Sequence, residues 1–241
     1  MKNQYFGDVR DFFKYSILRG LALEAGEGLT VCWMLTGNDD SGHGAQTGYL
    51  QSERGERLRA HSPGLFDALH QLVLRNGARE VSRATHEAIL PRARFITTPV
   101  PELLLERRAW FDAVLAAAEG SQLLFFDPDN GLEVKAHPLG SEGSSKYLYW
   151  AELADAVRAG HSCICFQYFR LRPSEANVES RGIEVTRRFP GIPVVSFATP
   201  DVAFFLVVRP EHPHLLDRSR EIGENWEGEV NVRFWRNDQA G

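Results

Sequence analysis

The sequence predicts a three-layer α/β fold with a mostly parallel sheet, a C-terminal antiparallel hairpin and a helical insertion after the first strand. Short apolar segments such as 123–126 alternate with longer segments of helical periodicity, as in a parallel sheet covered on both faces. The apolar segments 194–197 and 203–208 are too close together for a helical crossover, so they are expected to pair as a hairpin. No linker or internal repeat divides the chain, and residues 1–241 are therefore expected to form one domain.

The elements of the N-terminal half follow from the spacing of apolar residues. Such residues recur at helical spacing after Asp8, a residue type that commonly caps helices. The expected elements are a helix at 9–21, a strand at 29–35, helices at 65–74 and 81–90 within an insertion at roughly 46–92, a strand at 95–99 and a helix at 102–119.

The C-terminal half continues the alternation of strands and helices. A helix is expected to open at Ser144 and Ser145, with Lys146 in its first turn, where a cation opposes the helix dipole and is therefore expected to face an anion. The expected elements are a strand at 123–126, a helix at 144–159, a strand at 162–170, a helix at 181–189, the hairpin, and an edge strand within 225–235.

Composition limits the class of protein. The chain has 241 residues, of which 43% are hydrophobic, so it can bury the core of a sizeable α/β domain. The formal net charge of −5 excludes a broadly basic surface, and nucleic acid could bind only at a local patch. The densest basic segment is the insertion, which contains Arg54, Arg57, Arg59, Arg75, Arg79, Arg83, Arg92 and Arg94. We expect this segment to be the candidate nucleic-acid contact, with a plain solvated face as the alternative.

Cysteine use and hydropathy indicate the compartment. Cys32, Cys163 and Cys165 all fall within predicted strands, which favours small core residues in a reducing compartment over disulfides or a zinc site. No apolar segment approaches the roughly 18 residues that span a bilayer, and the first residues do not contain the apolar run of a signal peptide. A cytoplasmic protein without membrane contact is therefore expected.

The turn after residues 123–126 concentrates polar groups at one point of the predicted sheet. Asp127, Pro128, Asp129 and Asn130 place two carboxylates and one carboxamide within four residues. In open parallel sheets, ligands bind beyond the carboxyl ends of the strands. Asp127 is therefore predicted to lie at the mouth of a site with Asp129 and Asn130 on its rim, although an ordinary turn uses the same residue types.

A second polar segment follows the first predicted strand. Thr36, Gly37, Asn38 and Asp39 begin a loop that continues to Gly44. A glycine-bearing loop in this position often holds a phosphate or a nucleoside. Its glycines do not have the Gly-x-Gly-x-x-Gly spacing, so a solvated loop remains the alternative.

The N-terminal helix carries a charged pair beside its apolar stripe. Asp11 and Lys14 are three residues apart and therefore share a face of the helix. Lys14 is one of only four lysines among 27 basic residues. Because arginine is used at most basic positions of this chain, a lysine that is kept suggests a role that arginine does not fill. A surface ion pair is the alternative interpretation.

Together these features resemble the Rossmann-type SAM-dependent methyltransferases. A strand with a polar glycine loop, the Phe-Phe-Asp-Pro-Asp-Asn segment at 125–130 and the terminal hairpin carry the resemblance over most of the chain. More narrowly, Asp127-Pro128-Asp129-Asn130 is similar to the Asp-Pro-Pro-Tyr turn of the N6-adenine methyltransferases. Residues 11–15, Asp-Phe-Phe-Lys-Tyr, resemble the leader helix of the rRNA adenine methyltransferases, and the opening Asn-Gln-Tyr-Phe-Gly-Asp resembles a set of bacterial proteins of unassigned function.

This resemblance implies a cofactor, an acceptor and a set of site residues. It implies that SAM binds between the 36–44 loop and the Asp127 turn, and that an exocyclic amine of a nucleic-acid base accepts the methyl group. The residues predicted for catalysis are Asp127, Pro128, Asp129, Asn130 and Lys14, and those predicted for cofactor binding are Thr36, Gly37, Asn38, Asp39 and Asp11. Of these, the resemblance itself implies Asp127, Pro128, Asp11 and Lys14. Asp129 replaces the second proline of the motif, and Asn130 replaces the aromatic residue that stacks on the base.

Two other classes of function remain open. A Mg²⁺-dependent phosphodiester or phosphate hydrolase fits a cluster of oxygen ligands formed by Asp39, Asp40, Asp127, Asp129 and Glu133. A non-catalytic nucleotide-binding protein with a degenerate methyltransferase fold fits the departures from both motifs.

Overall fold

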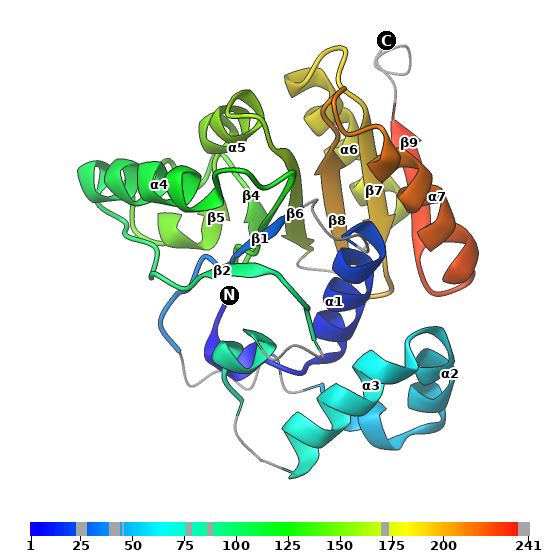
Figure 1. The fold of residues 1–241 in the computed structure, drawn as a ribbon. Helices are drawn as coiled ribbons and strands as arrows, with labels where there is room; N and C mark the ends of the chain where they lie inside the picture. Colours follow the sequence, from blue (N-terminus) through cyan, green and yellow to red (C-terminus); the bar gives the residue numbers. More distant parts are fainter. Residues whose placement is uncertain are drawn as a thin grey trace.

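A computed structural model describes residues 1–22, 28–38, 44, 46–75, 79–85, 89–169 and 174–235 (Figure 1). Its main feature is a seven-stranded sheet in the order β2-β1-β3-β6-β8-β7-β9, and a two-stranded sheet pairs β4 with β5. The strands are β1 (Leu29–Cys32), β2 (Arg94–Ile96), β3 (Leu123–Phe126), β4 (Gly131–Leu132), β5 (Tyr147–Leu148), β6 (Ser162–Tyr168), β7 (Val194–Ala198), β8 (Val202–Val207) and β9 (Asn231–Trp235).

Helices connect most of these strands. They are α1 (Val9–Leu21), α2 (Glu53–His61), α3 (Pro63–His70), α4 (Leu104–Ala118), α5 (Trp150–Arg158), α6 (Glu175–Arg188) and α7 (His214–Asn225). Short helical turns lie at Asn3–Tyr5, Gly48–Gln51, Gln71–Arg75, Val81–Thr85 and Ser144–Lys146. Within the described residues, no helix combines the length and apolar composition needed to cross a membrane.

The direction of the strands confirms the predicted fold class. β2, β1, β3 and β6 pair in parallel, whereas β8 is antiparallel to both of its neighbours, β6 and β7. The hairpin therefore inserts its second strand between β6 and its first strand, and β9 extends the sheet beyond β7. The carboxyl ends of β1, β3 and β6 meet at one edge, which is where polar loops gather.

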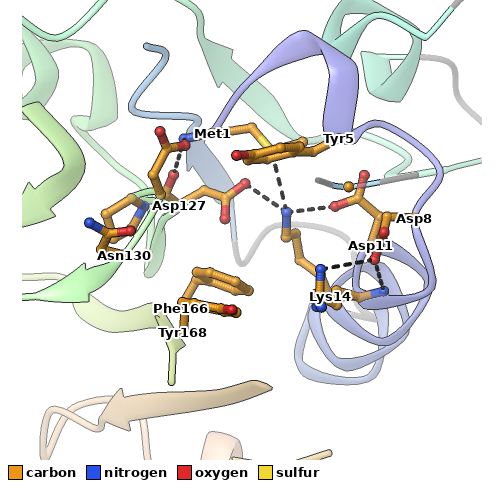
Figure 2. A pocket seen from close by; sticks show the side chains of 13 residues that line it. Met1, Tyr5, Asp8, Asp11, Lys14, Asp127, Asn130, Phe166 and Tyr168 are labelled. Carbon is orange, nitrogen blue, oxygen red and sulfur yellow. Dashed lines mark hydrogen bonds and ion pairs between the residues drawn. The ribbon is translucent and has the colours of Figure 1, made fainter. Parts of the chain in front are cut away.

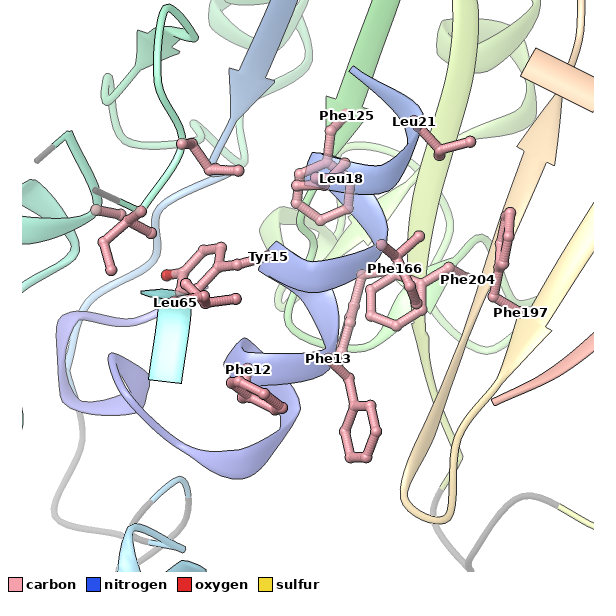
Figure 3. Packing of buried hydrophobic residues seen from close by; sticks show 14 of the residues in the cluster. Phe12, Phe13, Tyr15, Leu18, Leu21, Leu65, Phe125, Phe166, Phe197 and Phe204 are labelled. Carbon is pink, nitrogen blue, oxygen red and sulfur yellow. The ribbon is translucent and has the colours of Figure 1, made fainter. Parts of the chain in front are cut away.

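The sheet is buried on both faces. Phe204 and Leu206 of β8 pack in the cluster that contains α1, α3 and α7, whereas Phe205 and Val207 pack in the cluster of α4, α5 and α6. Such alternation within an entirely apolar strand is expected when helices cover both sides. Aromatic side chains dominate the face under α1 (Figure 3).

The structure corrects several boundaries. The helix predicted to open at Ser144 begins only at Trp150, because Tyr147–Leu148 pair with Gly131–Leu132 as β5 and β4. Lys146 therefore lies outside the first turn of α5, and the interpretation of its charge there is wrong. Glu152 accepts the Tyr149 backbone N–H at 3.0 Å and starts the helix instead.

Other corrections concern the insertion and the later helices. The helix predicted for 81–90 is a short turn at Val81–Thr85, and residues 86–88 lie outside the described part. The first strand ends at Cys32, because Met34 has a positive φ of 46° that turns the chain. α6 begins earlier than predicted, since Ser174 caps it by accepting the Asn177 N–H at 3.2 Å.

Candidate functional site

A buried ionic cluster joins the N-terminal helix to the end of the central strand. The Lys14 Nζ lies 2.7 Å from Asp11 Oδ1 and 2.7 Å from Asp127 Oδ2 (Figure 2). All three side chains are at most 3% exposed. This burial excludes the alternative in which Asp11 and Lys14 form a surface pair.

The packing of α1 places this cluster. Asp8 caps the helix by accepting the Arg10 N–H at 3.0 Å, and the apolar stripe of the helix packs on the sheet (Figure 3). Asp11 Oδ2 accepts the Gly7 N–H at 3.0 Å and the Tyr15 hydroxyl at 3.3 Å, which holds its other oxygen toward Lys14. The segment before α1, residues 3–8, thus helps to orient the Asp11 carboxylate through Gly7.

The charges in the cluster do not balance. One ammonium faces two carboxylates, and the rings of Trp33 and Phe166 lie 5.6 and 5.5 Å from it. Burial tends to lower the pKa of Lys14, but Asp11 and Asp127 outweigh this effect and raise the pKa above its ordinary value. Burial raises the pKa of Asp127, against the opposing effect of Lys14.

Met1 fills the crevice between the carboxyl ends of β1 and β3. Its nitrogen lies 3.1 Å from the Met34 carbonyl oxygen, 3.0 Å from the Asp127 carbonyl oxygen and 2.6 Å from Asp129 Oδ1. Its carbonyl oxygen accepts the Thr36 N–H at 3.0 Å. The Thr36 hydroxyl also donates to Asp129 Oδ2 at 2.6 Å, which ties the two loops together.

A cavity of about 260 Å³ adjoins this crevice, and Met1, Asp127 and Asp129 are among the residues that line it. Asp8 joins Asp11 and Asp127 on its acidic wall, and Arg10 lies among its lining residues. Tyr5, Phe166 and Tyr168 supply aromatic walls (Figure 2). The cavity therefore suits a flat apolar ligand that presents a hydrogen-bond donor to the carboxylates.

The structure brings together most, but not all, of the predicted site residues. Asp127, Pro128, Asp129, Asn130, Lys14 and Asp11 line this one cavity. Thr36 reaches it only through Asp129, whereas Gly37 and Asn38 are exposed on the loop. Asp39, predicted for cofactor binding, lies outside the described residues.

Sequence reasoning missed the aromatic walls of the cavity. Phe166 and Tyr168 are two residues apart on β6 and so point to one side of the sheet. β6 ends at the same edge as β3, and the rule that singled out Asp127 applies equally to the end of this strand. No pattern in the sequence predicted that Tyr5 lines the cavity, because its position depends on how residues 3–8 fold before α1.

The geometry of the carboxylates bears on the Mg²⁺ alternative. No three His, Cys, Asp or Glu side chains there are grouped to hold an ion, and Asp39 and Asp40 are outside it. Glu133 instead accepts the Trp150 N–H at 3.0 Å. Lys14 already supplies a positive charge to Asp127.

Some arginines of the insertion serve the fold. The Arg79 Nε donates to the Phe6 carbonyl at 3.0 Å, and the Arg94 guanidinium donates to the Glu119 carbonyl at 2.7 Å. Arg57 and Arg75 are exposed, as is Arg59, which pairs with Asp67 at 2.7 Å.

Comparisons with known proteins give little beyond this geometry. No family model matches the chain, and no curated protein matches its sequence significantly. A solved structure of a Legionella pneumophila protein, described by the family model DUF519, is similar over 95% of this chain and 97% of that one. The two share 9% identity with a TM-score of 0.44, and no inference is drawn from this likeness.

Proposed function

We propose that this chain is a SAM-dependent methyltransferase that acts on an exocyclic amine of a nucleic-acid base. The observation that supports this proposal is the position of Asp127 between a held methionine residue and an aromatic cavity. The polar loops after β1 and β3 hold Met1 by its nitrogen and its carbonyl oxygen. Met1 also lines the cavity, which has aromatic walls and an excess of carboxylate. The topology with an inserted antiparallel strand agrees with the resemblance noted in the sequence.

Met1 serves as a stand-in for testing whether the residues fit the cofactor. Its nitrogen represents the ammonium group of SAM, and its carbonyl oxygen represents one oxygen of the SAM carboxylate. Asp129 and two backbone carbonyls suit the ammonium, and the Thr36 N–H suits the carboxylate. The Met1 Sδ lies 3.8 Å from the Lys14 Nζ, on the side of the cavity. The crevice therefore fits the amino-acid part of SAM, provided that Met1 leaves it.

The residues of the cavity suit an amine acceptor. SAM, when bound, supplies a methyl group carried on a sulfonium. Asp127 Oδ2 accepts a hydrogen bond from Lys14, and within the described residues no hydrogen bond involves Oδ1. Oδ1 can accept an N–H of the amine, stabilise the positive charge that develops on its nitrogen, and take up the proton that the nitrogen releases. Burial raises the pKa of Asp127, which makes it a better proton acceptor.

The Asp127→Asn variant tests this proposal. Asparagine keeps the shape of the side chain and removes its charge, so methyl transfer to single-stranded RNA is expected to fall by about 10²- to 10³-fold, by analogy with the loss of one oriented polar group. The melting temperature and the affinity for SAH, measured by calorimetry, are expected to change little. A destabilised variant with unchanged turnover would contradict a catalytic Asp127.

One observation favours a second candidate, a base-binding protein without catalysis. Met1 is 3% exposed and occupies the crevice that SAM requires. Saturating SAH at about 100 times its dissociation constant should stabilise a methyltransferase by about 2.7 kcal/mol. Absence of any shift with SAH, together with binding of a nucleotide, favours the non-catalytic protein. Mg²⁺-dependent cleavage of a phosphodiester, abolished by Asp129→Asn, would overturn both readings.

A further inference from the structure

We propose that Tyr168 supplies the stacking surface for the base, which Asn130 cannot supply. This inference rests on the proposed function and narrows it to one residue and one kind of ligand. Asn130 occupies the position of the aromatic residue in the resembling motif, and a carboxamide offers no ring to a base. A base in the cavity therefore needs an aromatic face from another element.

Tyr168 lies directly beside Asn130. It ends β6, and its backbone N–H donates to the Asn130 carbonyl at 3.3 Å. The Gln167 amide donates to the same carbonyl at 3.0 Å and holds the two segments together. These hydrogen bonds hold the backbone of Tyr168 next to the turn that contains Asp127.

The ring of Tyr168 is available to a ligand. It lines the cavity and is 36% exposed, whereas the other exposed large apolar side chains among the described residues are Leu103, Leu104 and Leu105 at the start of α4. Phe166 lies on the same side of β6 but is only 8% exposed. Of these two rings on β6, Tyr168 presents the larger free face.

Arg10 occupies that face in the absence of a ligand. Its guanidinium lies over the Tyr168 ring, 5.8 Å from the centroid, so the ring faces a cation within cation–π range. Arg10 is held only loosely, because its ion pair with Asp8 spans 3.8 Å and its Nε has no hydrogen-bond partner among the described residues. A base can replace the guanidinium on the ring, and Arg10 can then bind the phosphate of the same nucleotide.

The size of the cavity narrows the class of substrate. A volume of about 260 Å³ is below that of pockets for drug-sized ligands, and it suits a single base. The reacting amine must reach Asp127, which is only 2% exposed. The substrate is therefore an unpaired base, either in a single strand or turned out of a duplex.

Titration of the protein with adenosine 5′-monophosphate and with a short oligoadenylate, each with and without SAH, tests this inference. Tyr168→Ala is expected to weaken binding of both probes by about 5- to 150-fold, which corresponds to the loss of one base–aromatic stack. Tyr168→Phe keeps the ring and is expected to bind as the unaltered protein does. Leu105→Ala removes an exposed apolar side chain outside the cavity; it is the control and should change the affinity less than twofold.

The outcomes separate this inference from the proposed function. Unchanged binding of both probes by Tyr168→Ala, or failure of the unaltered protein to bind either probe, overturns the role of Tyr168. Binding of SAH in that case leaves the proposed function standing. Probe binding that depends on the ring, without any binding of SAH, supports the stacking role and overturns the methyltransferase. Melting curves of each variant show that the fold is retained.

Discussion

Two buried ionic clusters hold the molecule together, and they differ in charge balance. In one, the Arg107 guanidinium donates two hydrogen bonds, of 2.6 and 2.9 Å, to the Glu152 carboxylate, and it also donates to the Tyr147 carbonyl. In the other, Lys14 is shared between Asp11 and Asp127. The Arg107 pair is neutral and joins α4 to α5, whereas the Lys14 cluster has an excess carboxylate.

The surroundings of the Arg107 pair and of the Lys14 cluster differ as well. The Arg107 guanidinium lies 4.8 Å from the Trp110 ring and 5.7 Å from the Tyr149 ring. The Lys14 cluster borders the aromatic cavity. Rings lie near both cations, so the clusters differ in charge balance and in the neighbouring cavity. A balanced pair determines how two helices pack, whereas an unbalanced cluster beside a cavity keeps an acceptor for a ligand. We therefore expect the Lys14 cluster to serve ligand binding and the Arg107 pair to stabilise the fold.

The largest expected effect is on stability at the balanced pair. Arg107→Met leaves Glu152 buried without its cation, and the free energy of unfolding is expected to fall by about 3–5 kcal/mol. Urea denaturation measures this loss. The double variant with Glu152→Met should recover most of it, because no unpaired charge then remains buried. A loss below 1 kcal/mol in the single variant would contradict the structural role.

Removal of Lys14 is expected to cost less and to depend on pH. In Lys14→Met the two carboxylates face each other, and one of them can take up a proton. The expected loss near neutral pH is about 1–3 kcal/mol. A carboxyl pKa raised in the folded state stabilises the fold below the ordinary value and loses that effect as the pH rises through the raised value. The variant should therefore regain stability as the pH falls from 7 toward 5, and a flat profile would contradict this account.

Sequence reasoning predicted the framework well where the signals were local. The wholly apolar β3 and the hairpin of β7 and β8 followed from short runs bounded by turn residues. The spacing of Asp11 and Lys14 placed both on one face of α1, and the end of β3 placed Asp127 at the edge of the sheet.

The features that the sequence did not predict depend on contacts between segments that are distant along the chain. β5 forms because Tyr147–Leu148 pair with Gly131–Leu132, and this pairing overrides the helical signal that follows Ser144. The entry of Met1 between β1 and β3 has no counterpart in any periodicity, since it needs both loops in place. The aromatic walls formed by Phe166 and Tyr168 were predictable in principle from the end of β6, whereas the position of Tyr5 was not.

Alkaline titration compares one group beside each cluster. Burial raises the pKa of Cys32, near Arg107, from 9.0 to about 12. Burial also raises the pKa of Tyr15, beside Lys14, well above 10.0. These groups stabilise the fold below their ordinary pKa values, and the effect is lost as the pH rises through the raised values. Stability should therefore fall above pH 9, by about 1.4 kcal/mol per pH unit for each group. Cys32→Ala and Tyr15→Phe should each reduce that slope, the first from about pH 9 and the second from about pH 10.

The smallest expected effect lies next to the Lys14 cluster. Thr36→Val removes the 2.6 Å hydrogen bond to Asp129 and leaves Lys14 untouched. The free energy of unfolding should fall by about 1 kcal/mol, whereas Thr36→Ser should change it less. Calorimetry with SAH on the same variants then reports whether a looser crevice binds the cofactor more readily. Equal stability of the valine and serine variants would show that this hydrogen bond contributes nothing.

The distance along the chain between Lys14 and Asp127 has a consequence for synthesis. The two residues are 113 positions apart, and ribosomes add about 5–20 residues per second. α1 therefore leaves the ribosome roughly 6–23 s before the carboxylate that completes its buried cluster. During that interval Phe12 and Phe13 lack the ring of Trp226, against which both of them pack. Nascent chains are thus open to chaperone binding, aggregation and proteolysis at α1 during that interval.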